Sequence, residues 1–121
     1  MFDHVQIKVK DFERSKTFYT EVLSTLGYKV VLEFKKAIGI GTSPHDMFEI
    51  SQADTDLPLS SSVHIAFVAQ SEEAVQKFHE TAIAHGAIDN GAAGLRDYEE
   101  GYYSAFVIDP DGHNLEAVFK K

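Results

Sequence analysis

His4-Val5-Gln6-Ile7-Lys8-Val9 is the stretch that decides the fold, because its pattern returns 60 residues later as His64-Ile65-Ala66-Phe67-Val68. Each stretch opens with a histidine and then alternates in the manner of a half-buried β-strand. A helix-capping residue follows each histidine after seven positions, and a helical phenylalanine recurs at the same 60-residue spacing; these matching residues are Asp11 and Ser71, then Phe18 and Phe78. The chain is therefore predicted to contain one structural unit twice.

Each half predicts the order strand, helix, strand, strand, strand. In the first half, β-branched and aromatic runs and an apolar helical stripe place strands at residues 2–9, 28–34, 37–41 and 47–51, with a helix at 12–26. In the second half, strands are predicted at 63–68, 87–90, 102–108 and 113–119, with a helix at 72–85 and a Gly-rich loop at 90–101. The fold class is therefore α+β, with two βαβββ modules in a single domain, 1–121: module one at 1–52, a polar linker at 53–61 and module two at 62–121.

The composition argues against several functional classes. The net charge of −8 disfavours nucleic-acid binding, because an acidic surface repels phosphates. The chain has no cysteine, which excludes disulfides, thiolate-bound zinc and iron–sulfur clusters. No apolar run approaches the roughly 20 residues that a membrane-spanning helix needs, and the strand pattern beginning at Phe2 leaves no room for a signal peptide. We therefore expect a cytoplasmic protein that binds neither nucleic acid nor membrane.

Each half also ends in a short strand with one acidic residue, Glu49 in the first half and Glu116 in the second. Strand alternation predicts that the apolar face of each sheet packs on its helix, while the other face presents a histidine, His4 or His64, together with the glutamate. A duplicated unit that presents one His and one Glu twice is a candidate metal site made from two halves. Imidazole and carboxylate ligands suit one divalent ion of zinc, nickel, iron, manganese or cobalt.

With these motifs the chain resembles the vicinal oxygen chelate superfamily, which includes glyoxalase I, extradiol dioxygenases, fosfomycin-resistance proteins and bleomycin-binding proteins. The resemblance runs from Asp3 to Phe119, and the matching motifs are Asp3-His4-Val5, the helix between Asp11 and Gly27, His64-Ile65-Ala66-Phe67, and Asp109-Pro110-Asp111-Gly112-His113-Asn114-Leu115-Glu116. The resemblance implies that the modules form a curled mixed sheet around a cleft, and that the protein is a homodimer. It also implies a set of metal ligands: His4, Glu49, His64 and Glu116.

A ligand set of two histidines and two glutamates resembles that of glyoxalase I. It implies a metal-dependent lyase or isomerase acting on a small-molecule substrate with two neighbouring oxygens, and Glu116 or Glu49 would be the catalytic base. With Fe²⁺ and only the three ligands His4, His64 and Glu116, the site would suit an extradiol-type dioxygenase. A non-catalytic small-molecule binding protein is the third interpretation.

Four residues are candidates for substrate contact: Lys8, Arg96, Tyr103 and Asn114. Where bacterial glyoxalases carry an arginine for the glutathione carboxylate, Lys8 keeps the charge but loses the bidentate fork. Arg96 is the one cation in a loop of acids, and the favoured interpretation is an ion pair with a neighbouring acid; the alternative is an anion anchor on a lid. The acids are Asp97, Glu99 and Glu100, and the remaining histidines are predicted to lie at the surface: His45, His79, His85 and His113.

Overall fold

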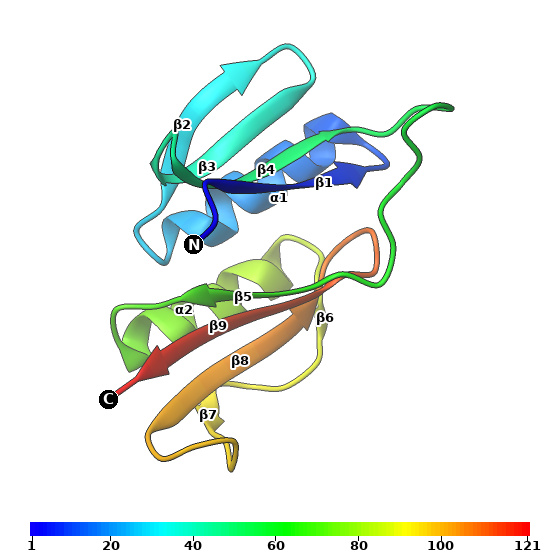
Figure 1. Cartoon of the computed structure of the whole chain (residues 1–121). Coiled ribbons are helices and arrows are strands. Elements are labelled where there is room, and N and C mark those ends of the chain that lie inside the picture. Colours follow the sequence, from blue (N-terminus) through cyan, green and yellow to red (C-terminus); the bar gives the residue numbers. More distant parts are fainter. The chain divides into compact units, whose positions relative to one another are not determined.

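A computed structural model describes the whole chain, residues 1–121. The chain divides into two compact units, Met1–Ser60 and Ser61–Lys121. Each unit contains one helix and one sheet, and the strands of each sheet come from that unit alone (Figure 1). The predicted α+β fold of two βαβββ modules is therefore confirmed.

The first unit has the element order β1 (His4–Val9), α1 (Phe12–Ser24), β2 (Lys29–Phe34), β3 (Ala37–Ser43) and β4 (Asp46–Gln52). Its sheet has the strand order β1-β4-β3-β2, in which β1 is parallel to β4 and the other two pairs are antiparallel. The first strand of the unit thus pairs with its last strand. This pairing brings the predicted histidine and glutamate of the unit onto neighbouring strands.

The second unit repeats this order with one addition. Its elements are β5 (His64–Val68), α2 (Glu72–Ala84), β6 (Ile88–Asp89), β7 (Gly94–Leu95), β8 (Tyr102–Ile108) and β9 (Asn114–Lys120). The strand order is β5-β9-β8-β6, and β7 pairs with β8 beside this path. As in the first unit, the first strand is parallel to the last, and β8 is antiparallel to β9.

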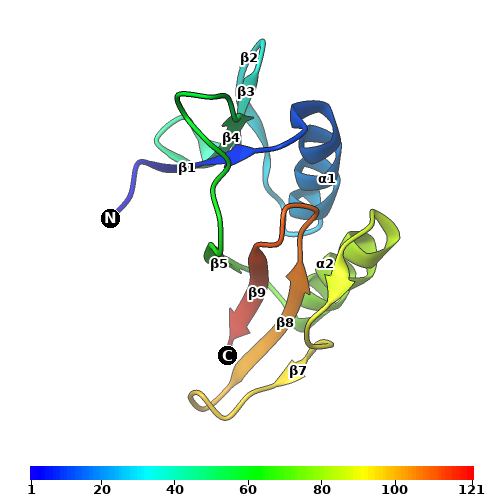
Figure 2. The same ribbon diagram turned by 90° about the vertical axis from the view of Figure 1, so that its right-hand side faces the viewer.

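In each unit the helix lies against one face of the sheet (Figure 2). The apolar residues on this face, which recur at every second position, are almost fully buried. The buried residues of the first unit include Ile7, Val9, Ile38, Ile40 and Ile50 from the sheet and Phe18, Tyr19 and Val22 from α1; those of the second include Ala105, Val107, Leu115 and Ala117 from the sheet and Val75, Phe78 and Ala82 from α2.

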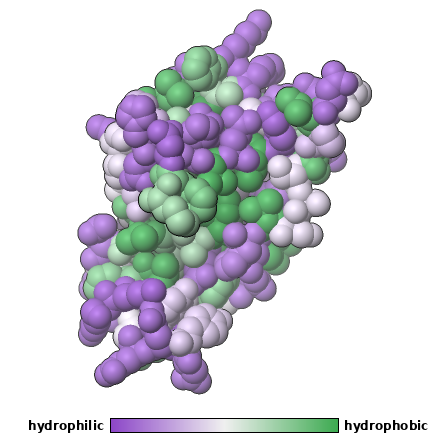
Figure 3. Space-filling view, viewed as in Figure 1, coloured by the Kyte–Doolittle hydropathy of each residue, from purple (hydrophilic) through white to green (hydrophobic).

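Both helices begin where the capping residues predicted. Asp11 accepts a hydrogen bond from the backbone N–H of Arg14 at 3.2 Å, and Ser71 accepts one from Ala74 at 3.1 Å. Each helix has 13 residues, and neither is long and apolar enough to span a membrane. Hydrophobic residues also reach the surface: the face seen in Figure 3 has green, hydrophobic areas bordered by purple, hydrophilic ones.

Two details of the second unit differ from the sequence prediction. The segment 90–101 is not a loop throughout, because Gly94 and Leu95 pair with Ser104 and Tyr103 as β7. A strand of two residues, one of them glycine, offers no alternation of side chains by which to recognise it.

His113 is also not at the surface as predicted but fully buried. The ring Nδ1 of His113 accepts a hydrogen bond from the backbone N–H of Val63 at 3.2 Å, and the backbone N–H of His113 donates to Asp109 Oδ1 at 2.8 Å. The alternation that turns His113 away from Glu116 places it on the same face as Leu115, which is the buried face.

Gly41 on β3 is needed for the close approach of β4. A Cβ added there would lie 2.0 Å from the backbone oxygen of Asp46 and 2.7 Å from Met47 Cα. Because backbone atoms cannot move aside cheaply, we expect Gly41→Ala to lower the free energy of unfolding by roughly 1–3 kcal/mol in urea denaturation. Gly39→Ala is the control, since its Cβ would overlap with the flexible end of the Met47 side chain and would make ordinary contacts with Glu49 and Leu32 at 3.5 Å. Equal losses from both variants would refute this account.

Candidate metal centre

The two predicted His–Glu pairs have the same register in the two sheets. In the first unit His4 lies opposite Met47, and Gln6 lies opposite Glu49. In the second unit His64 lies opposite Asn114, and Ala66 lies opposite Glu116. The residue two positions after each histidine therefore faces the glutamate across a parallel strand pair. Residues paired in this way point to the same face, so each sheet presents its histidine and its glutamate on one side.

Side-chain distances bring each pair together within its own unit. His4 Nε2 lies 3.7 Å from Glu49 Oε1, and His64 Nε2 lies 3.3 Å from Glu116 Oε1. No group of three or more His, Asp or Glu side chains is arranged to hold a metal ion. The structure thus places each predicted ligand beside one other ligand, and the repeated element is the pair.

Hydrogen bonds at Nδ1 determine which histidine atom faces the glutamate. His64 Nδ1 lies 3.0 Å from the carbonyl oxygen of Asn114, which can only accept, so Nδ1 must carry the proton. In the neutral ring the lone pair of Nε2 then points toward Glu116. Two acceptors at 3.3 Å repel one another unless a proton or a metal cation lies between them.

Asp3 performs the same function for His4. Its Oδ1 lies 2.7 Å from His4 Nδ1, and its Oδ2 lies 2.9 Å from His45 Nδ1. The hydrogen bond to Asp3 and the nearby charge of Glu49 raise the pKa of His4, and the two histidines lower the pKa of Asp3. A carboxylate behind a ligand histidine fixes the ring and increases its basicity, as in many metal sites.

Glu49 belongs to a chain of polar side chains on the same sheet face. Lys8 Nζ donates to Ser51 Oγ at 2.7 Å, Ser51 donates to Gln6 Oε1 at 3.0 Å, and Gln6 Nε2 donates to Glu49 Oε1 at 3.2 Å. Lys8, a predicted substrate contact, is therefore linked to Glu49 through two neutral side chains. Only Oε1 of Glu49 takes part in this chain and in the contact with His4.

Tyr102 is a site residue that the sequence did not single out. Its hydroxyl donates to Glu116 Oε2 at 2.5 Å, and Glu116 is only 3% exposed. Burial, reinforced by this hydrogen bond, raises the pKa of Tyr102 to about 12. Both oxygens of Glu116 are thus engaged, one by Tyr102 and the other by His64.

Tyr103, the tyrosine that was predicted as a substrate contact, lies on the opposite face. Its hydroxyl accepts a hydrogen bond from Gln76 Nε2 of α2 at 2.9 Å. The register of β8 shows the reason, since Phe106 lies opposite Glu116 and Tyr102 shares the face of Phe106. Alternation within β8 was readable from sequence, but nothing in the strand itself indicated which of its faces met the helix.

The other predicted contacts are placed as follows. Asn114 lies opposite His64, and its Oδ1 accepts from Asn90 Nδ2 at 3.3 Å. Arg96 does not form the expected ion pair with a loop acid: its guanidinium lies over the ring of Phe106, 5.4 Å from the centroid. Glu99 pairs with Lys120 at 2.6 Å instead, because the antiparallel β8–β9 pair brings the end of β9 beside the loop.

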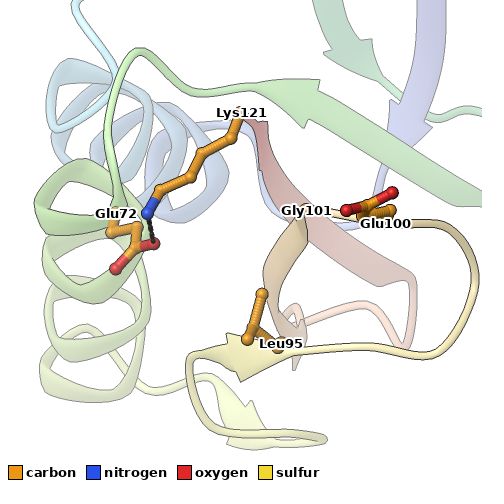
Figure 4. Close-up of a pocket in the computed structure, with 5 residues that line it drawn as sticks. All are labelled: Glu72, Leu95, Glu100, Gly101 and Lys121. Atoms are coloured by element: carbon orange, nitrogen blue, oxygen red, sulfur yellow. Dashed lines mark ion pairs between the residues drawn. The ribbon is translucent and has the colours of Figure 1, made fainter.

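A cavity of about 450 Å³ opens elsewhere in the second unit, lined by Glu72, Leu95, Glu100, Gly101 and Lys121. Figure 4 shows the ion pair between Lys121 and Glu72, whose charged atoms are 3.7 Å apart. None of the predicted ligands or substrate contacts lines this cavity. It is therefore not part of the candidate metal centre.

The raised pKa of Tyr102 predicts a pH effect of known sign. A group whose pKa rises from 10 to about 12 on folding contributes stability below pH 10, and this stability is lost as the pH rises from 10 to 12. In a spectrophotometric titration of the folded protein, we expect Tyr102 to ionise near pH 12, and Tyr102→Phe to reduce the absorbance change in that range by one tyrosine. Tyr28, whose pKa burial also raises, contributes equally to both titrations. Tyr98→Phe, which removes the hydroxyl of an exposed neighbouring ring, should keep the full change near pH 12. A full change in Tyr102→Phe would contradict the assignment.

Comparisons with known proteins concern the family and the fold. The sequence profile of the Glyoxalase/Bleomycin resistance protein/Dioxygenase superfamily matches residues 1–117. The crystal structure of a glyoxalase/bleomycin resistance protein from Albidiferax ferrireducens T118 is 33% identical, covers 100% of this chain and 99% of its own, and has a TM-score of 0.86. A search of curated proteins gives no match.

Two more distant structures share the fold. A glyoxalase/bleomycin resistance protein/dioxygenase family enzyme from Burkholderia phytofirmans PsJN is 20% identical, with 98% of each chain covered and a TM-score of 0.76. Lactoylglutathione lyase from Agrobacterium tumefaciens is 18% identical, covers 98% of this chain and 92% of its own, and has a TM-score of 0.69. At these identities the likeness concerns the fold alone.

Proposed function

Since the chain belongs to the glyoxalase/bleomycin resistance protein/dioxygenase superfamily, we propose that it is a divalent-metal-dependent lyase or isomerase of the glyoxalase type. Its substrate would be a small molecule with two neighbouring oxygens. The observation that carries the proposal is the repeated pair in which a histidine Nε2 faces a glutamate oxygen at 3.7 Å in one unit and 3.3 Å in the other.

The donor atoms fit a divalent metal ion. We propose that His4, Glu49, His64 and Glu116 bind it together, each unit contributing one pair, either within one chain or between the chains of a homodimer. Neutral imidazole nitrogens and carboxylate oxygens suit zinc, nickel, iron, manganese or cobalt. When bound, such an ion would supply Lewis acidity toward the two neighbouring oxygens of the substrate.

The two glutamates have different surroundings, and we propose different roles for them. Glu116 has both oxygens engaged, one by Tyr102 and one by His64. In Glu49, Oε1 makes the contacts with Gln6 and His4, whereas Oε2 accepts no hydrogen bond from the protein. Glu49 is therefore better suited to take a proton from the substrate, and Glu116 to serve as a fixed ligand.

Lys8 is compatible with the role of Glu49 as a base, because it does not contact the carboxylate directly. Its ammonium reaches Glu49 only through Ser51 and Gln6. This chain orients Oε1 without placing the positive charge directly on the carboxylate. A direct ion pair would favour the charged form of Glu49 and so weaken it as a base.

Metal content tests the proposal. Untagged protein purified without chelator would be analysed by mass spectrometry, beside Glu116→Ala, Glu49→Ala and the control Glu33→Ala, which removes an exposed carboxylate of β2. We expect a single divalent ion for each set of four ligands in the wild type and in Glu33→Ala, and its loss from both other variants. A wild type that takes up no nickel, zinc, iron or manganese would overturn the enzyme proposal and favour a binding protein.

The Glu49→Ala variant separates the two enzymatic interpretations. Both oxygens of Glu116 are engaged, by Tyr102 and by His64, whereas Glu49 has contacts on Oε1 alone, so Glu49 is the ligand that the protein holds with fewer contacts. A metal retained without Glu49 would favour three ligands and the extradiol-type dioxygenase. Loss of the metal would favour the four-ligand glyoxalase type.

A further inference from the structure

Arg96 lies on the same face of the second sheet as His64 and Glu116. Gly94 of β7 is opposite Ser104, and the backbone N–H of Arg96 donates to the carbonyl of Tyr102 at 2.8 Å. Two residues after Gly94, Arg96 is thus aligned with the row of Tyr102, Ser104 and Phe106, which faces Glu116. The segment 90–101 therefore delivers its one cation to the face that carries a His–Glu pair.

The guanidinium is held in place by several contacts. It lies 5.4 Å from the centroid of the Phe106 ring, and its Nη2 donates to the carbonyl of Ala92 at 2.7 Å. The ring of Phe106 in turn stacks on His64, with the centroids 6.2 Å apart and the planes 22° apart. One aromatic ring therefore connects Arg96 to the ligand histidine.

Two glycines leave the space that the guanidinium fills. A Cβ at Gly94 would lie 3.2 Å from Arg96 Nη1, and a Cβ at Gly91 would lie 3.2 Å from Arg96 Nη2 and from Phe106 Cδ1. Gly91 also has a φ of +144°, which other residues rarely adopt. The backbone around Arg96 is thus shaped to its head group.

No carboxylate neutralises this charge, although the segment is rich in acids. Of those acids, Glu99 is paired with Lys120, and Arg96 uses its side chain only on the carbonyls of Ala92 and Leu95 and on the Phe106 ring. A purely structural role for Arg96 in the loop would not require an unpaired positive charge beside His64 and Glu116. The remaining donors of the guanidinium fork are available to an anion.

We propose that Arg96 binds a carboxylate of the substrate, which narrows the substrate class to small monocarboxylic acids that also carry two neighbouring oxygens. The two neighbouring oxygens in this description rest on the proposed function; the carboxylate does not. A carboxylate matches the planar fork of arginine in two parallel hydrogen bonds. A single charge is favoured over a phosphate dianion, because Arg96 is the one cation of a segment that also carries Asp97, Glu99 and Glu100, in a chain of net charge −8.

Propionate titrated into metal-free protein tests the proposal, with nuclear magnetic resonance signals of the Arg96 side chain and of the 94–97 backbone as the readout. We expect propionate to shift these signals and neutral propionamide to leave them unmoved. Arg96→Met should weaken propionate binding by at least about tenfold, as expected when hydrogen bonds to a charged group are lost. Arg14→Met, which removes the other arginine of the chain from α1, is the matched control and should bind as the wild type does.

Gly94→Ala provides a variant that keeps the arginine. Its Cβ would lie 3.2 Å from Nη1, so the guanidinium would have to shift by a few tenths of an ångström, and we expect weaker propionate binding with an unchanged charge. The proposal is overturned if propionate leaves the Arg96 signals unmoved, if Arg96→Met binds as well as the wild type, or if inorganic phosphate moves the signals at lower concentration than propionate. Because the protein is stripped of metal, propionate binding without any later metal uptake would support Arg96 as the anchor while refuting the proposed enzyme.

Discussion

Glu49→Gln is expected to lower the turnover number by about 10²–10⁴-fold, the usual contribution of a general base. Glutamine keeps the size of the side chain and an oxygen for the hydrogen bond from Gln6, but it cannot take a proton. The measurement is the rate at which metal-loaded protein exchanges solvent deuterium into hydroxyacetone, a small hydroxyketone with two neighbouring oxygens. Rates would be expressed for each bound metal ion, so that a loss of metal is not mistaken for a loss of base.

The matched control is Glu33→Gln, which changes an exposed carboxylate of β2 that pairs with Lys16. Its turnover should equal that of the wild type. Glu116→Gln should chiefly reduce metal affinity, because both oxygens of Glu116 are already engaged. Full turnover in metal-loaded Glu49→Gln, or a larger turnover loss in metal-loaded Glu116→Gln, would show that the roles of the two glutamates are assigned wrongly.

Phe78→Ala is expected to lower the free energy of unfolding by about 3–5 kcal/mol. Phe78 is fully buried on α2, where the helix packs on β8 and β9, and its truncation would leave a cavity in a close-packed interior. Because a domain is typically stable by only about 5–15 kcal/mol, this is a large share of the total. Equilibrium unfolding in urea, followed by circular dichroism, measures the loss.

Phe34→Ala is the control for that measurement. Phe34 on β2 is 61% exposed, and its truncation should change the unfolding free energy by no more than about 0.5 kcal/mol. A loss below about 1 kcal/mol in Phe78→Ala would contradict the assignment of Phe78 to the core.

The fold was largely predictable because both of its signals are local. Alternation identified the strands, and the capping residues Asp11 and Ser71 marked the first turn of each helix. The same alternation assigned His4 and Glu49 to one face, and His64 and Glu116 to another. The distances within each pair follow from a parallel pairing that the repeated βαβββ order implies.

The contacts around the His–Glu pairs could not be predicted, because they depend on which of two adjacent residues faces the pair. Tyr102 and Tyr103 are adjacent and chemically identical, and only the pairing of β8 with β9 and its packing on α2 decide which one reaches Glu116. The partner of Arg96 could not be predicted either, since three acidic residues lie close to it in sequence. Its position over Phe106 depends on the short β7 pairing and on space left by two glycines.

The segment between β4 and β5 lies outside both His–Glu pairs, and both members of each pair lie on the same side of it. A protease that cut there would separate two fragments without dividing either pair. In evolutionary terms, a half-length gene would already encode one complete pair, and tandem fusion of two copies would double it. Each copy would then be free to diverge around its own pair; the residue opposite the glutamate is Gln6 in the first unit and Ala66 in the second.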